Sequence, residues 1–141
     1  MTFEQKILDV VLSMNTSPNF IGGDWWKVNI AAESVVMPAV IYINPVSGSM
    51  EFGTQALDNP NVLIAFMNKV VLDADFSDTN SCVNSMKELM VEFVILANSS
   101  GYFYPIKEIR YEVTYDRLDS NLCGVILSAS IKERAGIKIP C

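Results

Sequence analysis

Histidine is absent from the 141 residues of this sequence. Its absence removes the usual general base near neutral pH, the Ser-His and Cys-His nucleophile pairs, and the commonest zinc ligand. The sequence also has no GxGxxG loop and no GxxxxGK[ST] loop, so dinucleotide and P-loop phosphate binding have no support. These absences predict a protein that is not an enzyme and that uses no cofactor.

Basic residues are few: ten Lys and Arg stand against sixteen Asp and Glu, for a formal net charge of −6. Because the basic residues are scattered singly along the chain, no patch can neutralise a run of phosphates. Sequence-specific nucleic-acid binding is therefore not expected. A negative surface is compatible with a passage through which DNA moves without adhering.

Long apolar runs are missing as well. The longest, residues 35–43 and 62–72, are interrupted and fall short of the roughly 18 to 20 apolar residues of a membrane span. Glu4, Lys6 and Asp9 interrupt any hydrophobic segment at the N-terminus, which speaks against a secretory signal and predicts synthesis in the cytoplasm. Half of the residues are nevertheless hydrophobic, enough for one folded domain and for surface that an oligomer would cover.

Only three cysteines occur, Cys82, Cys123 and Cys141, and none has CxxC spacing. An odd number in a chain without a secretory signal fits reduced thiols. We expect Cys82, in the apolar stripe of a helix, and Cys123, in a strand, to be buried and unreactive. Cys141 is expected to be exposed at the end of the chain.

Three carboxylates, Asp73, Asp75 and Asp78, lie close together between a predicted strand and a predicted helix, where they could seat a hard cation. An EF-hand loop counted from Asp73 needs glycine at its sixth position and glutamate at its twelfth, but these positions hold Asp78 and Asn84. We therefore predict no metal site, and interpret the three as solvated carboxylates with Asp78 near the positive end of a helix.

Apolar spacing predicts two helices. Thr2 and Gln5 have the spacing of a capping box, and apolar residues recur at helical intervals over residues 3–14. A longer amphipathic helix is predicted to be capped by Ser77 or Asp78, with apolar residues at a 3.6-residue period as far as Ala97.

Strands are predicted over residues 25–31, 35–43, 61–72, 109–115 and 122–131. Residues 61–72 should be central, either buried on both faces or bulged near Asn68, and the last two strands should form a hairpin whose first strand is half-buried. Residues 15–23 are expected to be a loop, 44–60 a long arm or a loose hairpin pairing around Met50 and Phe52, and 134–141 a tail. The prediction is one α+β domain, 1–133: a mainly antiparallel sheet packed by one long amphipathic helix and an N-terminal helix.

Several apolar side chains are candidates for contact with a partner. Trp25 and Trp26 are adjacent, so in a strand one of them points outward, where it either anchors a partner or packs under the long loop. The Tyr102-Phe103-Tyr104 cluster could stack on bases or sugars, but without flanking basic residues packing in the core or at its rim is favoured. The interface candidates are Trp25, Trp26, Met50, Phe52, Tyr102, Tyr104, Ile137 and Ile139.

The order of predicted elements resembles that of the tail terminator and head-to-tail connector proteins of tailed bacteriophages. Three stretches carry the resemblance: MPAVIYINP at 37–45, NVLIAFMNKV at 61–70 and YDRLDSNLCGVILSAS at 115–130. The last is also similar to segments of uncharacterised proteins from phages and prophages of gut Bacteroidetes. Many members of the family carry further C-terminal elements, so the place of this chain within the neck stays open.

The resemblance implies a structural virion protein, made in the host cytoplasm, that forms a ring between portal and tail and lines a DNA passage. Its partners would be copies of itself and other neck, portal or tail proteins, with no membrane involved. A second hypothesis is a small ligand-binding or regulatory domain, with a pocket between sheet and helix lined by Trp25 or Trp26, Phe93 and Tyr102. A metal-dependent enzyme using Asp73 and Asp75 has the least support.

Overall fold

The computed structural model describes residues 2–23, 38–45, 47–69, 76–117, 122–133 and 137–138. The predicted α+β class is confirmed, because the described residues combine helices with a mixed sheet. The predicted strand at 25–31, with Trp25 and Trp26, lies outside the described residues. The elements in chain order are α1 (Phe3–Leu12), β1 (Asn19–Gly23), β2 (Ala39–Ile43), β3 (Gly48–Phe52), β4 (Gln55–Lys69), α3 (Phe76–Ser99), β5 (Arg110–Arg117), β6 (Leu122–Ser130) and β7 (Ile137–Lys138).

The body of the molecule is built on a sheet with the strand order β1-β2-β4-β6-β5. β1 and β2 run parallel, whereas β2–β4, β4–β6 and β5–β6 are antiparallel. β4 is central, as predicted, and its ladder with β6 is regular from Asn61 to Lys69. Of the two alternatives for this strand, burial on both faces is therefore confirmed for its central part, and a bulge near Asn68 is wrong.

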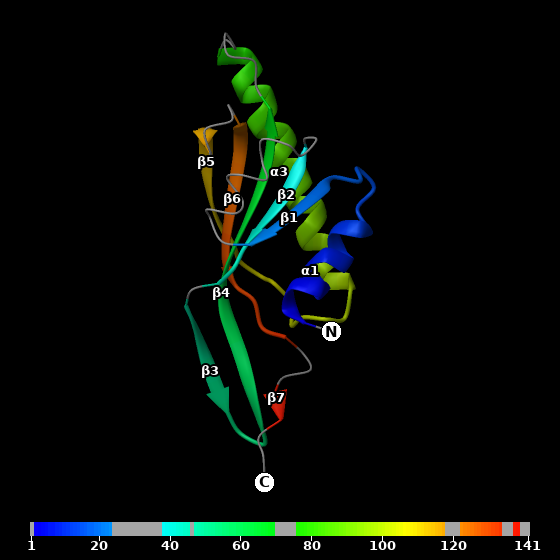
Figure 1. The fold of residues 1–141 in the computed structure, drawn as a ribbon, viewed down its shortest axis with the longest axis vertical. Coiled ribbons are helices and arrows are strands. Elements are labelled where there is room, and N and C mark those ends of the chain that lie inside the picture. The colour runs from blue at the N-terminus through cyan, green and yellow to red at the C-terminus, as the bar shows by residue number, and fades with distance from the viewer. Residues whose placement is uncertain are drawn as a thin grey trace.

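β4 continues beyond the body into a projecting arm. Its first residues pair with β3 on one side, from Gly48↔Pro60 to Phe52↔Ala56, and with β7 on the other. Figure 1 shows β3, this half of β4 and β7 extending away from both helices. Residues 48–60 and 137–138 are called the arm below. The hairpin predicted around Met50 and Phe52 is confirmed, and β7 adds a strand where a tail was expected.

Two boundaries differ from the sequence-based expectation. The predicted loop 15–23 contains β1, because pairing with β2 overrides the weak strand propensity of a segment that ends in two glycines. α3 begins at Phe76, so Ser77 and Asp78 lie inside its first turn and neither is the capping residue. The capping box of α1 forms as predicted, with Thr2 as its N-cap.

α1 and α3 cover one face of the sheet (Figure 1) and bury a large apolar cluster against it. Aromatic side chains fill its centre, with the Phe66 and Phe93 rings 5.7 Å apart and the Phe3 and Phe103 rings 5.5 Å apart. Burying one such side chain fully contributes about 1.5 to 3 kcal/mol. Neither helix in the described part of the chain has the length and apolar character needed to cross a bilayer.

The opposite face of the sheet carries a second apolar cluster. Its members are Ile21, Ala39, Ile41, Ile43, Ala65, Met67 and Ile126. Because β2 and β4 contribute to both clusters, every residue of β2 is buried. Burial on both faces explains why these strands read as continuous apolar runs rather than as alternating ones.

Cys82 of α3 and Cys123 of β6 form a disulfide, with their Cα atoms 6.4 Å apart. The expected burial is confirmed for Cys123, Cys82 is only half-buried, and the expectation that both thiols are reduced is wrong. It rested on cysteine number and compartment, which carry no information on distance. The packing of α3 on β6 brings together two residues that are 41 positions apart in the sequence.

Candidate interaction surface on the projecting arm

Two large apolar side chains are exposed on β3 of the arm. Met50 is 50% exposed and Phe52 is 75% exposed. Alternate residues of a strand share a face, so the two lie on one face of β3 and Glu51 lies on the other. Asp58 of β4 pairs with Met50 and therefore shares its face, so this face carries two exposed apolar side chains and one acidic residue.

The hairpin itself is built by close backbone approach at its base. A Cβ atom on Gly48 would lie 2.9 Å from the carbonyl oxygen of Asn59, so glycine is required for the strands to meet there. Asn61 secures the same end, because its backbone N–H donates to the carbonyl of Ser47 and its side-chain amide donates to the Ser47 hydroxyl, both at 3.0 Å. The base of the arm is therefore fixed.

A short segment after β6, residues 131–133, fastens the arm to the body and is called the clasp. Lys132 forms an ion pair with Glu51, with 2.6 Å between Nζ and Oε2, and its Nζ lies 5.3 Å from the centre of the Tyr104 ring. The backbone N–H of Tyr104 donates to the carbonyl of Lys132 at 2.8 Å. The hydrogen bond from Lys132, assisted by its charge, lowers the pKa of the Glu51 carboxyl.

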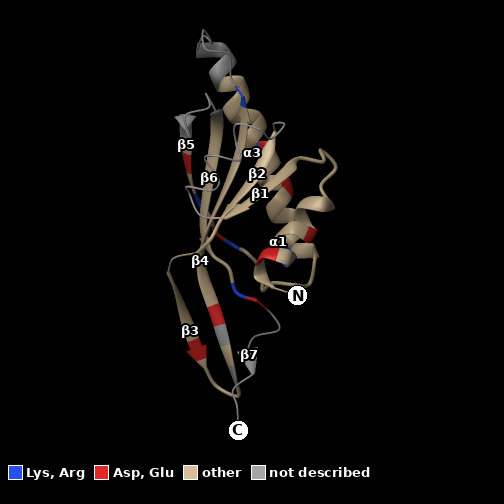
Figure 2. Ribbon diagram, viewed as in Figure 1, with Lys and Arg blue, Asp and Glu red and all other residues tan. Residues whose placement is uncertain are grey.

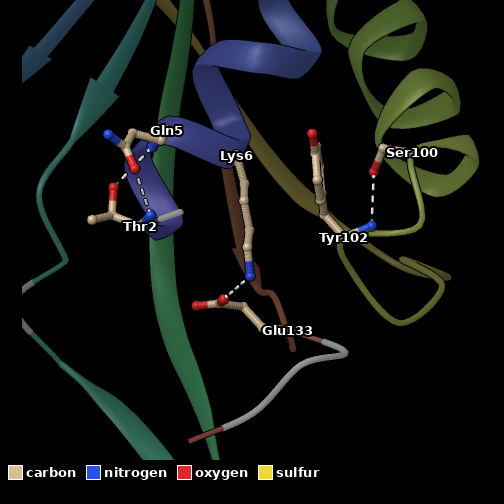
Figure 3. A network of polar contacts seen from close by, with 6 residues as sticks. All are labelled: Thr2, Gln5, Lys6, Ser100, Tyr102 and Glu133. Carbon is tan, nitrogen blue, oxygen red and sulfur yellow. Dashed lines mark hydrogen bonds and ion pairs between the residues drawn. The ribbon is translucent and has the colours of Figure 1, made fainter.

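The clasp also reaches α1. Figure 3 shows Lys6 pointing from α1 toward Glu133, with which it forms an ion pair, beside the Thr2–Gln5 capping box. The backbone N–H of Ile131 donates to the carbonyl of Pro60 at 3.3 Å, which ties the clasp to β4. Three consecutive residues thus connect the N-terminal helix, the Tyr104 turn and the arm.

The structure separates the predicted interface residues into groups. Met50 and Phe52 lie on the arm, and Tyr104, which is 39% exposed, lies at its base beside the clasp. Tyr102 is half-buried on the body, where its hydroxyl donates to Asp9 at 2.5 Å and its backbone N–H to Ser100 (Figure 3). Ile137 pairs with β4 through its backbone. Its side chain and all of Trp25, Trp26 and Ile139 lie outside the described structure.

The alternative hypothesis placed Phe93 and Tyr102 in the lining of one ligand pocket. The two residues do not line a common pocket among those found in the described structure. Phe93 is fully buried against Phe66 in the core. Tyr102 packs edge-on against Phe103, with 6.1 Å between ring centres. A hollow of about 230 Å³ lies elsewhere, at the junction of arm and body, and Ile43, Pro45 and Leu63 form its apolar part.

Sequence patterns missed other exposed apolar side chains. Val91 and Ile95 lie four residues apart on α3 and are 52% and 59% exposed. The prediction of a half-buried strand is wrong for the described side chains of β5, because Tyr111 and Val113 are 48% and 38% exposed at the edge of the sheet. An alternating pattern of apolar and polar residues shows that a strand has an apolar face. It does not show whether another element packs on that face.

The candidate cation site at residues 73–78 lies outside what the structure describes. Among the described residues, no three Cys, Asp or Glu side chains form a group that could hold a metal ion. No protein-family model and no curated protein matches this chain. The likeness to phage neck proteins therefore stays a prediction.

Proposed function

We propose that this chain is a structural subunit that assembles with copies of itself into an oligomeric ring, using the arm as its principal contact. The projecting arm, with Met50 and Phe52 exposed on one face, carries the proposal. No described part of the body packs on that face, so another molecule is the partner that we propose for it. The clasp supports the same role by holding the arm in one direction before contact.

Energetics support a contact of this kind. Burial of apolar surface contributes about 25 cal/mol per Å², or about 1.5 to 3 kcal/mol for a Phe or Met side chain that becomes fully covered. In a ring, the arm of each copy contacts the next copy around the ring. The surface that binds the arm is then a different part of the molecule from the arm itself. Such head-to-tail contacts close into rings when the rotation between neighbours allows it.

The setting that we propose is the neck or tail of a tailed bacteriophage, as a tail terminator or head-to-tail connector. This rests on the resemblance in element order and in the stretches 37–45, 61–70 and 115–130. The proposal includes a more detailed description of the fold, in which a mainly antiparallel sheet is packed by one long amphipathic helix. Other neck, portal or tail proteins would be its further partners.

Charge is consistent with a DNA passage. The formal net charge is −6, and Figure 2 shows acidic residues on both long strands of the arm, where Glu51 and Asp58 lie. A ring lined by such surfaces repels the DNA backbone and lets it slide. No catalytic step is part of this function.

Light scattering across a range of concentrations, with negative-stain images of the eluted particle, tests the proposal. We expect a closed ring for the wild type and a monomer for the double variant Met50→Ser, Phe52→Ser. The matched control is Leu12→Ser, which removes an apolar side chain that is 72% exposed on α1. This control should leave the ring intact.

Two results would contradict the proposal. One is a wild-type protein that stays monomeric at every concentration and does not associate with virions. The other is a ring that still forms in the double variant without the Met50 and Phe52 side chains. That result would assign the contact between subunits to another surface. Circular dichroism of each variant establishes that the fold is retained.

A further inference from the structure

The disulfide between α3 and β6 is accessible from one side only. Cys82, in the second turn of α3, is half-buried, whereas Cys123 is fully buried. In β6, Cys123 lies between Asn68 of β4 and Tyr115 of β5, with α3 packed above. Cys82 is therefore the more accessible residue of the pair.

The backbone of β6 approaches β4 closely at the residue after Cys123. At its neighbour Gly124, an added Cβ atom would lie 1.9 Å from the carbonyl oxygen of Phe66. The sulfur of Cys82 also lies 3.5 Å from the carbonyl oxygen of Cys123, a position from which a reduced Cys82 thiol can donate a hydrogen bond.

We propose that Cys82 and Cys123 form a thiol–disulfide exchange site in which Cys82 reacts with small thiols and disulfides and Cys123 is the resolving thiol. In reduction, a thiolate RS⁻ attacks the Cys82 sulfur, the Cys82–Cys123 bond breaks, and Cys123 leaves as a thiolate that takes up a proton. A second RS⁻ attacks the outer sulfur of the mixed disulfide and releases RSSR and the Cys82 thiol. Two RSH are oxidised to RSSR for each protein disulfide reduced, and a small disulfide reverses the process.

The exchange changes how α3 is held. The disulfide joins its N-terminal half to the sheet, assisted by buried Val83 and Met86 and by Lys87, whose Nζ lies 5.0 Å from the centre of the Tyr111 ring. Its C-terminal half is held independently by fully buried Phe93 and other core residues. Reduction therefore loosens the first half of the helix and leaves the second half docked.

The test uses the full chain with Cys141→Ser, so that only the two relevant thiols remain. Adding Cys123→Ser leaves Cys82, and adding Cys82→Ser leaves Cys123. Each protein is incubated with oxidised glutathione, and the mixed disulfide is followed by mass spectrometry. We expect Cys82 to be modified at least about tenfold faster than Cys123, because the reaction rate depends on access to the attacking thiol.

A control in concentrated urea should make the two rates equal, which assigns the difference to the fold. Hydrogen exchange on the protein with both cysteines gives the second readout. We expect faster exchange over residues 80–87 after reduction and unchanged exchange over residues 89–97. Equal rates in the folded variants, faster reaction at Cys123, or a pair that stays reduced in excess oxidised glutathione would each overturn the proposal, which does not depend on ring assembly.

Discussion

Gly124 lies where β6 passes very close to β4. Alanine there would place its Cβ atom 1.9 Å from the carbonyl oxygen of Phe66, and only a backbone shift in the central strand can relieve that overlap. We expect Gly124→Ala to lower the free energy of unfolding by about 3 kcal/mol, as for other overpacked positions. Urea denaturation measures the change.

Gly53, in the turn of the arm, is the matched control. A Cβ atom there meets nothing within 4 Å, so Gly53→Ala should change the free energy of unfolding by no more than about 0.5 kcal/mol. If the two substitutions lowered the free energy of unfolding equally, the close approach of β6 to β4 would not be the reason that position 124 requires glycine.

Tyr42 makes stability depend on alkaline pH. Burial, with smaller contributions from Glu4 and Glu133, raises the pKa of its phenol to about 12. In the unfolded chain the pKa is near 10, so ionisation favours unfolding, and this stabilisation is complete below about pH 10 and lost by about pH 12. The free energy of unfolding should fall by roughly 2 to 3 kcal/mol over that interval.

Urea denaturation at several alkaline pH values, compared with Tyr42→Phe, isolates this contribution from other groups that titrate there. The phenylalanine variant should lose less stability between about pH 10 and about pH 12 than the wild type. Parallel curves for the two proteins would refute the assignment to Tyr42.

At the scale of elements, the clasp determines how firmly β3 is held. Glu51→Gln removes the ion pair with Lys132, so amide exchange over residues 48–52 should become faster while exchange over residues 89–97 of α3 stays unchanged. Salt at about 1 M should have the same effect on the wild type, because the Debye length then falls to about 3 Å and the exposed ion pair is weakened. Glu88→Gln, on the exposed side of α3, is the control variant and should change neither region.

The elements differ in how well sequence predicts them, for physical reasons. α1 and α3 follow from apolar residues at helical spacing, and the β5–β6 hairpin follows from alternation and the polar turn between its strands, although the expected burial of β5 is wrong. A hairpin around Met50 and Phe52 was expected, but the continuation of β4 through its first six residues was missed, since Asp58, Asn59 and Pro60 are poor strand formers. They are extended because β3 and β7 pair with them, and pairing between distant segments has no local signature.

For the whole molecule, the α+β class follows from composition and element order, but the arm and the disulfide do not. The two candidates Met50 and Phe52 were found because they alternate in a segment with little other pattern. Their exposure on a projecting hairpin, and the clasp that holds it, depend on Lys132 meeting Glu51 across 81 residues of chain. The disulfide depends in the same way on a helix lying over a particular strand.

β4 also has a mechanical role. Its fifteen residues span about 50 Å, from the end of the arm to the middle of the sheet. A pull on the arm along this strand loads the ladders with β2 and β6 in shear, so that many hydrogen bonds carry the tension together and none opens first. Any molecule bound to the arm is therefore coupled directly to the central strand of the sheet.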